Sequence, residues 1–261
     1  MLKKILLFAL VIAFSVGSRN IHADILFSEA FTYADGLPPP PWLLISGSGG
    51  QSIINNQLAI TANQTPGVTG DYSRAFAGPV SSGTLFAGYD ITITASPTDS
   101  GDNYFAHFSG VAGATGSTFT TRAFLNLNAG VTQIALSEGA TPAVVTEATA
   151  LPLNTVLRVV QGYDFSTGTS TLWLNPTSSS SPSISDASAV NPASISAFNF
   201  RINNNSDGNK IIDNLKLATT FNEALTFTAV PEPNSIGLVS LIVCTGLVTA
   251  SRRRNAKWHS L

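Results

Sequence analysis

The sequence predicts an all-β body, an antiparallel two-sheet sandwich, between residues 24 and 221, and three observations lead to this prediction. Short segments of this region alternate apolar and polar residues with a period of two, which is typical of half-buried strands. Glycine and proline separate these segments, as at Gly110, Gly130 and Pro142. The region has no apolar stripe with a 3.6-residue period and capping residues. Many short strands joined by polar loops favour two packed sheets.

Three segments show the alternation most clearly. We expect these residues to share one face within each segment: Leu85, Ala87, Tyr89, Ile91, Ile93 and Ala95; Phe198, Phe200 and Ile202; Ile211, Asp213, Leu215 and Leu217. Their β-branched and aromatic side chains suit a pleated surface. Residues 176–194 are rich in serine and show no periodicity. We therefore expect a long surface loop there, after Trp173.

The order of segments resembles a known family. The stretches ILFSEAFTYADG, DNYFAHFSG, LNTVLRVVQGYDFSTGTSTLWLNP and KIIDNLKLATTF resemble the LamG-like, concanavalin-type sandwich domains of bacterial exported proteins. The resemblance covers most of residues 24–221 and implies a jelly-roll of two antiparallel sheets. It implies no single activity, because such sandwiches host lectins, glycosidases and plain spacers. Residues 222–229 then form a linker to the tail.

The first 23 residues predict a secretory signal peptide. Lys3 and Lys4 precede an apolar run of 12 residues, 5–16, and a polar stretch closes on Ala23. A helix of that length rises about 18 Å, which is short of a ~30 Å hydrocarbon core. We expect the mature chain to begin near Asp24; the alternative is a retained anchor.

The C-terminal residues 230–255 have three parts in a fixed order. Val230, Pro231, Glu232 and Pro233 form an extended motif, because proline fixes φ and restricts the residue before it. Residues 236–251 form an apolar run of 16 residues, about 24 Å long as a helix, which spans a bilayer marginally. A basic cluster follows at residues 252–257 and is expected to stay on the cytoplasmic side. It contains Arg252, Arg253 and Arg254.

This order of motif, apolar helix and arginines is similar to the PEP-CTERM sorting signal of Gram-negative bacteria. The resemblance covers about the last 30 residues. It implies recognition and cleavage by an exosortase, after a transient stay in the inner membrane. The freed protein would then reach the cell surface or the extracellular matrix. The alternative is an ordinary tail anchor that is never cut.

The charge of the body excludes one class of partner. From Asp24 to Glu232, six lysines and arginines stand against 15 acidic residues, a net charge of −9. Nucleic-acid affinity depends on clustered cations, so we expect no nucleic-acid partner. The single cysteine, Cys244, lies in the apolar run of the tail. The body therefore has no disulfide and no thiol nucleophile.

The inventory of catalytic residue types is sparse. A glycosidase needs two carboxyl groups in one cleft, and no segment of the body has two glutamates on one strand. His107 is the only histidine of the body, without a zinc motif or a nucleophile elbow beside it. We expect it to be a partly exposed sheet residue. The sequence thus predicts no catalytic residue; a hydrolase would need distant carboxylates to converge.

Two kinds of binding site are expected instead. The acidic loops near Asp99 and Asp207 offer oxygen ligands of the type that calcium takes. The resemblance to sugar-binding sandwiches further implies a structural calcium near the joined first and last strands, where Glu29 and Asp213 hold the matching positions. These carboxylates could equally be solvated turn residues. No other cofactor is expected.

Tryptophans are the second kind of candidate. Trp42 and Trp173 would form a glycan platform if their rings were exposed, because the faces of sugars stack on aromatic rings. Packing between the sheets is the alternative for both. Together these patterns predict a non-enzymatic exported protein whose body is structural or binds polysaccharide. A secreted glycan-active hydrolase and a protein-binding adhesin are the other hypotheses.

Overall fold

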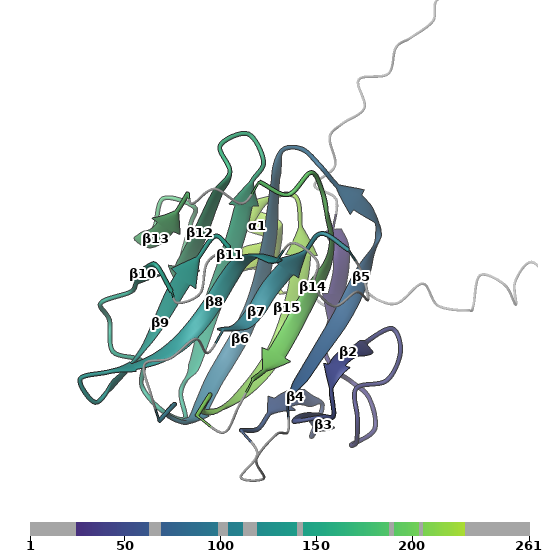
Figure 1. Cartoon of the computed structure of the whole chain (residues 1–261), viewed down its shortest axis with the longest axis vertical. Helices are drawn as coiled ribbons and strands as arrows, with labels where there is room; N and C mark the ends of the chain where they lie inside the picture. The colour runs from purple at the N-terminus through teal and green to yellow at the C-terminus, as the bar shows by residue number, and fades with distance from the viewer. Residues whose placement is uncertain are drawn as a thin grey trace, which may run out of the picture.

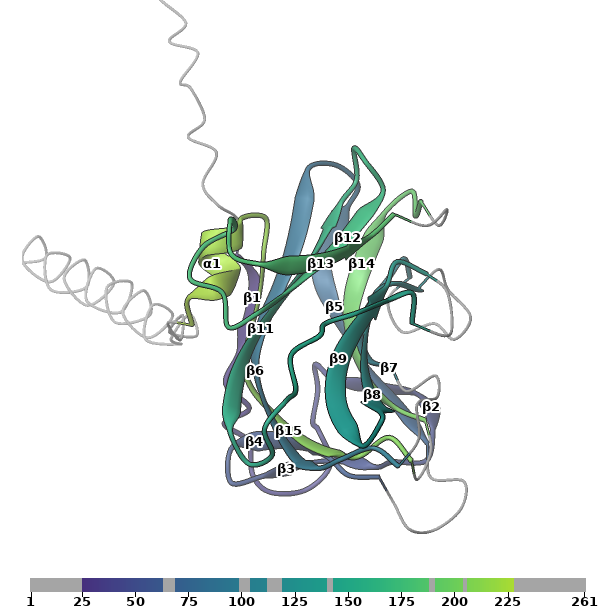
Figure 2. The ribbon, with the colours of Figure 1, turned by 90° about the vertical axis from the view of Figure 1, so that its left-hand side faces the viewer.

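The computed structural model describes residues 25–62, 69–98, 104–111, 119–139, 143–187, 191–203 and 206–227. These residues form two antiparallel sheets that face each other, so the expected sandwich is confirmed (Figures 1 and 2). The signal peptide, with Ala23 and Asp24, lies outside the described residues, as does the whole C-terminal signal. Among the described residues, no helix has the length and apolar character needed to cross a membrane.

The first sheet has eight strands. Along the sheet the strands run β13 (Ser183–Asp186), β12 (Thr169–Leu174), β11 (Val156–Asp164), β6 (Thr84–Ala95), β15 (Asn209–Ala218), β4 (Gln57–Ile60) and β3 (Gln51–Ile54). Strand β1 (Ile25–Glu29) pairs with β15 as well. The first and last strands of the body are therefore neighbours.

The second sheet has seven strands. Its order is β10 (Val145–Thr146), β9 (Val131–Ser137), β8 (Phe119–Asn128), β7 (Tyr104–Ser109), β14 (Ile195–Ile202), β5 (Gly70–Val80) and β2 (Leu43–Gly47). This sheet lies at the front in Figure 1 and at the right in Figure 2. One short helix, α1 (Phe221–Leu225), lies on the outer side of the eight-stranded sheet.

The core lies between the sheets and confirms most of the alternation. The inward residues of β6, from Leu85 to Ile93, are buried in one cluster with Phe198, Phe200 and Ile202 of β14. The expectation for β15 was only half right. Ile212, not Ile211, packs in the core, whereas Leu215 and Leu217 do so as expected. A bulge between Asp213 and Lys216 shifts the register, so the inward face changes partway along the strand.

The serine-rich segment is more ordered than its composition predicts. Within residues 176–194, strand β13 pairs with β12 and extends the eight-stranded sheet. Similarly, the segment expected to be a linker begins with α1. Thr220 caps this helix, since its hydroxyl accepts from the backbone N–H of Glu223 at 3.4 Å. The folded body thus continues past residue 221 to the end of α1.

Candidate functional site

Neither tryptophan forms an exposed platform. Trp42 is 2% exposed and packs against Phe31 and Phe200, with ring centroids 5.9 and 5.8 Å apart. Trp173 is 8% exposed and packs against Phe86 and Phe221 on the outer side of the eight-stranded sheet. Both rings are buried because their large apolar area contributes most to stability when water is removed from it. The proposed glycan platform at these two residues is therefore wrong.

The carboxylate of Glu29 contacts four other residues of the body. Its carboxylate accepts hydrogen bonds from the backbone N–H of Phe31, the hydroxyl of Tyr33 and the indole N–H of Trp42. It also forms an ion pair with Arg74 of the opposite sheet. An arginine and three hydrogen-bond donors thus already surround the Glu29 carboxylate. Its role is to hold the two sheets together.

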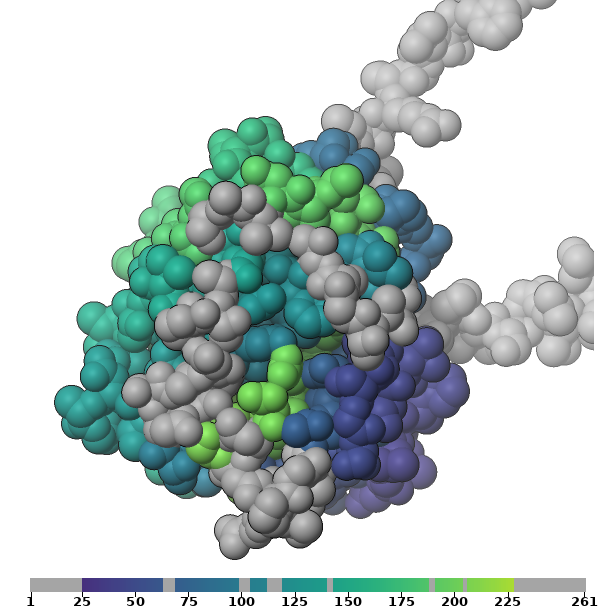
Figure 3. Space-filling model, viewed as in Figure 1, coloured from purple at the N-terminus to yellow at the C-terminus, as the bar shows by residue number. Residues whose placement is uncertain are grey.

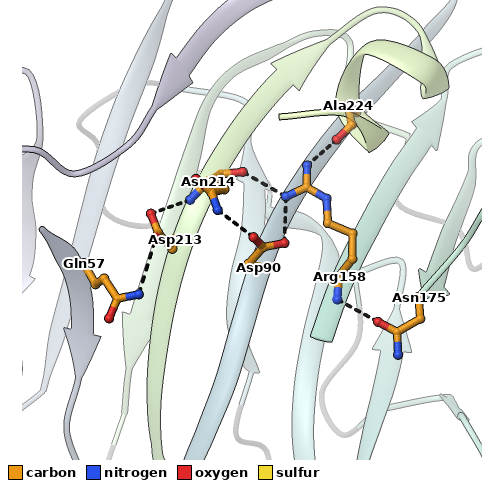
Figure 4. Close-up of polar contacts among 7 residues, drawn as sticks. All are labelled: Gln57, Asp90, Arg158, Asn175, Asp213, Asn214 and Ala224. Atoms are coloured by element: carbon orange, nitrogen blue, oxygen red, sulfur yellow. Dashed lines mark hydrogen bonds and ion pairs between the residues drawn. The ribbon is translucent and has the colours of Figure 1, made fainter. Parts of the chain in front are cut away.

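Asp213 belongs to a polar network on the outer face of the eight-stranded sheet (Figure 4). It accepts from the side-chain amide of Gln57 at 3.2 Å and from the backbone N–H of Asn214 at 2.7 Å. It therefore does not share a site with Glu29. Among the described residues, no three metal-binding side chains gather at one place. Of the acidic loops proposed for calcium, residues 99–103 lie outside the described residues. In the other loop, Asp207 accepts from the backbone N–H of Asn203.

The same network fastens α1 to the sheet. The guanidinium of Arg158 donates to the carbonyl oxygen of Ala224 at 2.6 Å, to that of Asn214 at 2.9 Å and to Asp90 at 3.1 Å. The amide of Asn214 donates to the second oxygen of Asp90 at 2.7 Å. Gly88 makes room for the helix, because an added Cβ there would lie 1.8 Å from the Ala224 oxygen. These contacts form a structural clamp that holds α1 on the sheet.

A different polar group lies on the outer face of the seven-stranded sheet (Figure 3 views this side of the molecule). Ser73, Asn199 and His107 occupy paired positions on the neighbouring strands β5, β14 and β7. The amide nitrogen of Asn199 lies 3.5 Å from Nδ1 of His107. The hydroxyl of Ser73, Oδ1 of Asn199 and Nε2 of His107 are buried and have no hydrogen-bond partner among the described residues. We call these three residues the polar row.

Next to the polar row lies a pair of residues that are more exposed to solvent, and we call this pair the margin of the row. Asp71 and Arg201 are paired positions on β5 and β14 and form an ion pair at 3.6 Å. Their side chains are 12% and 22% exposed. Arg201 also donates to Asn203 at 2.6 Å and lies over the ring of Tyr104, 4.3 Å from its centroid. Burial raises the pKa of Asp71, while Ser46 and Arg201 act against that rise.

The expectation that His107 is partly exposed is wrong. It is fully buried, between Tyr104 and Phe119, with ring centroids 5.3 and 4.4 Å away. Burial lowers its pKa from 6.5 to about 3; the Phe108 carbonyl opposes this shift and Arg122 adds to it. The imidazole is therefore neutral at pH 7 and stays so well below that pH. A histidine with so low a pKa is a weak general base, because a catalytic base works best with a pKa near the operating pH.

Sequence reasoning singled out His107 but missed the rest of the polar row and its margin. Asn199, His107 and Arg201 each stand at an outward position between two core residues of their strands. That pattern is ordinary for a sheet with one polar face. Only the register between strands shows that the polar residues are neighbours.

Comparison with solved structures finds chains that are similar to this one. The peanut lectin solved with a nine-residue peptide has a TM-score of 0.51 and 11% identity, covering 74% of this chain and 95% of the lectin chain. The globular domain of T. cruzi calreticulin has a TM-score of 0.49 and 9% identity, covering 77% and 91%. Lectin II from Ulex europaeus has a TM-score of 0.46 and 15% identity, covering 75% and 98%. No protein-family model and no curated protein matches the sequence.

At such low identities this likeness establishes the fold alone. The body is a concanavalin-type β-sandwich of the kind seen in legume lectins.

Proposed function

We propose that this protein is an exported, non-enzymatic glycan-binding protein of the cell surface or extracellular matrix. The observation that carries the proposal is the polar row and its margin on the outer face of the seven-stranded sheet. Buried polar atoms normally have partners, so three neighbouring ones without a described partner call for a ligand or for ordered water. The likeness to a lectin fold is consistent with this reading and adds no site of its own.

Polysaccharide suits the chemistry of this face. Sugar hydroxyls donate and accept hydrogen bonds, and the polar row together with Asp71 and Arg201 offers both kinds of group. The ring of Tyr104 lies between two guanidinium groups, those of Arg201 and Arg122, at 4.3 and 4.9 Å from its centroid. Arg201 and Asp71 form the accessible margin, so a glycan would first contact the protein there.

The binding test removes the ion pair at that margin. The double variant Asp71→Asn, Arg201→Gln keeps the net charge and removes both charged groups together, which avoids leaving one of them unpaired. We expect at least a tenfold loss of affinity for the exopolysaccharide of the host cell, measured by surface plasmon resonance on the full chain. Asp164→Asn, a partly exposed carboxylate at the end of β11, is the control. Equal binding by wild type and the double variant would refute a glycan site on this face.

The export route of the proposal rests on the two ends of the sequence. Residues 1–23 act as the signal peptide, and residues 230–255 act as the sorting signal that an exosortase cuts. With a helix of 16 residues, the basic cluster must fix the cytoplasmic end, since each charge costs roughly 2.5–3.5 kcal/mol to bury at the centre of the bilayer. Val230 to Pro233 then lie at the outer interface, at a set depth for a membrane protease.

The sorting test compares processing in cells that carry an exosortase. Replacing Arg252, Arg253 and Arg254 with alanine should let the tail slide and leave uncut precursor. Glu232→Ala should block recognition without loosening the anchor. Intact-mass spectrometry of the exported protein reports both ends at once. Wild type that keeps Leu261 would show that the tail is only an anchor, and an intact Met1 would refute the signal peptide.

A further inference from the structure

A cavity of about 400 Å³ opens at one side of the sandwich, away from the polar row. Its walls come from the segment after β10 and from the turn between β12 and β13. Strands β10 and β13 are end strands of the two sheets, so the cavity lies where one edge of each sheet meets the other. Figure 2 looks at this side of the molecule, where β9 and β13 lie. The cavity is lined by residues that include Glu147, Thr149, Leu174, Asn175, Ser181 and Pro182.

We propose that this cavity is a second carbohydrate site, for a neutral or amino-bearing sugar. Its volume falls within the ~300–1,000 Å³ that is usual for ligand pockets. Its lining includes residues with hydroxyl, amide and carboxylate groups: Thr149, Ser181, Asn175 and Glu147. Leu174 and Pro182 supply apolar surface for the C–H face of a sugar ring. This combination of few fixed polar groups and some apolar wall is the general composition of a small-molecule site.

The walls of the cavity are fixed before any ligand arrives. Asn175 is held on both sides by the backbone of Arg158, since it donates its N–H at 2.7 Å and accepts through its side chain at 2.8 Å. The hydroxyl of Ser181 accepts from the backbone N–H of Thr177 at 3.0 Å. The buried indole of Trp173 donates to the carbonyl of Ser179 at 3.3 Å. A preformed site loses less conformational entropy when it binds.

The charge of the cavity selects its ligand. Among the described residues that line it, Glu147 is the only charged one. One oxygen of Glu147 accepts from the backbone and the hydroxyl of Thr149, at 3.2 and 3.0 Å. Both of these bonds go to the same oxygen, Oε1. A carboxylate without a cation nearby repels uronic acids and phosphates, and it attracts an ammonium group. We therefore place glucosamine-type sugars first, neutral sugars second and acidic sugars last.

The test uses three oligosaccharides of equal length and the purified full chain. Isothermal titration calorimetry measures binding of a glucosamine hexamer, a glucose hexamer and a galacturonate hexamer at low salt. We expect Glu147→Gln to weaken the glucosamine hexamer about tenfold and to change the glucose hexamer less than threefold. Thr149→Trp, at an exposed position, should fill the cavity and abolish binding of both. Asp35→Asn is the matched control, because it removes one exposed negative charge on another loop.

The outcomes separate this site from the one on the polar row. The double variant Asp71→Asn, Arg201→Gln should bind the glucosamine hexamer like wild type, because it changes no residue of the cavity. Loss of binding in that double variant would place the hexamer on the polar face and overturn the second site. Full binding by Thr149→Trp would overturn it as well. A galacturonate hexamer that binds as tightly as the glucosamine hexamer would refute the charge selection.

Discussion

At the residue scale, Glu29 illustrates how a carboxylate can be structural. It comes from β1, near the start of the folded body, and its four partners include Arg74 of the other sheet. Such a group is costly to remove, because Arg74 would keep a charge in a largely buried place without its counter-charge.

We predict that Glu29→Gln lowers the free energy of unfolding by about 3–5 kcal/mol, the usual cost of breaking a buried ion pair. Urea unfolding followed by circular dichroism measures this change. Glu147→Gln serves as control, since that side chain is partly exposed and accepts hydrogen bonds from its exposed neighbour Thr149, and it should change stability by less than about 1 kcal/mol. A similar effect of both variants would contradict the structural role of Glu29. Calcium or its chelation should leave the unfolding midpoint of wild type unchanged.

A second residue, His107, makes stability depend on pH. Its pKa is about 3 in the folded chain and 6.5 as an isolated group. Between these values the unfolded chain binds a proton that the folded chain does not, so acidification favours unfolding. The loss is about 1.4 kcal/mol for each pH unit below roughly 6.5. Asn199, Arg122, Tyr104 and Phe119 surround the imidazole.

His107→Gln should remove this contribution and keep a polar side chain in the same place. We predict that its free energy of unfolding falls less steeply between pH 6.5 and 4 than that of wild type, by about one bound proton. Urea titrations at five pH values provide the comparison. Parallel curves for the two proteins would show that His107 is protonated in the folded state as easily as in the unfolded one.

At the element scale, α1 is held by contacts that only Gly88 permits. The carbonyl oxygen of Ala224 lies where the Cβ of an alanine at position 88 would be. Phe221 packs on Trp173 with ring centroids 4.9 Å apart, and the Arg158 guanidinium completes the attachment. The helix is too short to be stable alone, so it depends on this docking.

Gly88→Ala should therefore release α1 from the sheet. We predict a loss of about 1–3 kcal/mol in stability, the usual cost of forcing extra volume into a packed contact. The tryptophan emission should shift to longer wavelength as Trp173 becomes exposed to water. Gly78→Ala, on β5, is the control, because an added Cβ there meets nothing within 4 Å. Unchanged emission and stability in Gly88→Ala would disprove the tight approach of the helix.

At the scale of the whole molecule, the two sheets and α1 should behave as one folding unit. The apolar cluster between the sheets includes residues from both, and no disulfide is available to the body. We predict that residues 24–227, expressed alone, unfold in one cooperative transition with a β-type circular dichroism spectrum. A chain that ends at residue 220 should be less stable, because Phe221 and Ala224 no longer cover Trp173. Equal midpoints for the two chains would contradict this boundary.

Much of the fold could be predicted from local pattern. The period-two alternation of β6 and β14 identified their inward residues, because side chains of a strand point to opposite faces in turn. The Thr220-to-Glu223 spacing is a capping-box signal, which is typical of a helix start such as that of α1. These features depend on residues that are close in the sequence, so the sequence by itself determined them.

Tertiary structure decided the rest, because burial depends on residues that are distant in sequence. Asn214, with φ of 50°, lies in the bulge of β15 that exchanges its inward and outward faces. Trp173 lies on the face opposite Leu172 and Leu174, where α1 covers it. His107 and Asn199 become neighbours only through the register of β7 and β14. Alternation alone cannot specify that register or a covering helix, since both depend on which strands and helices meet in space.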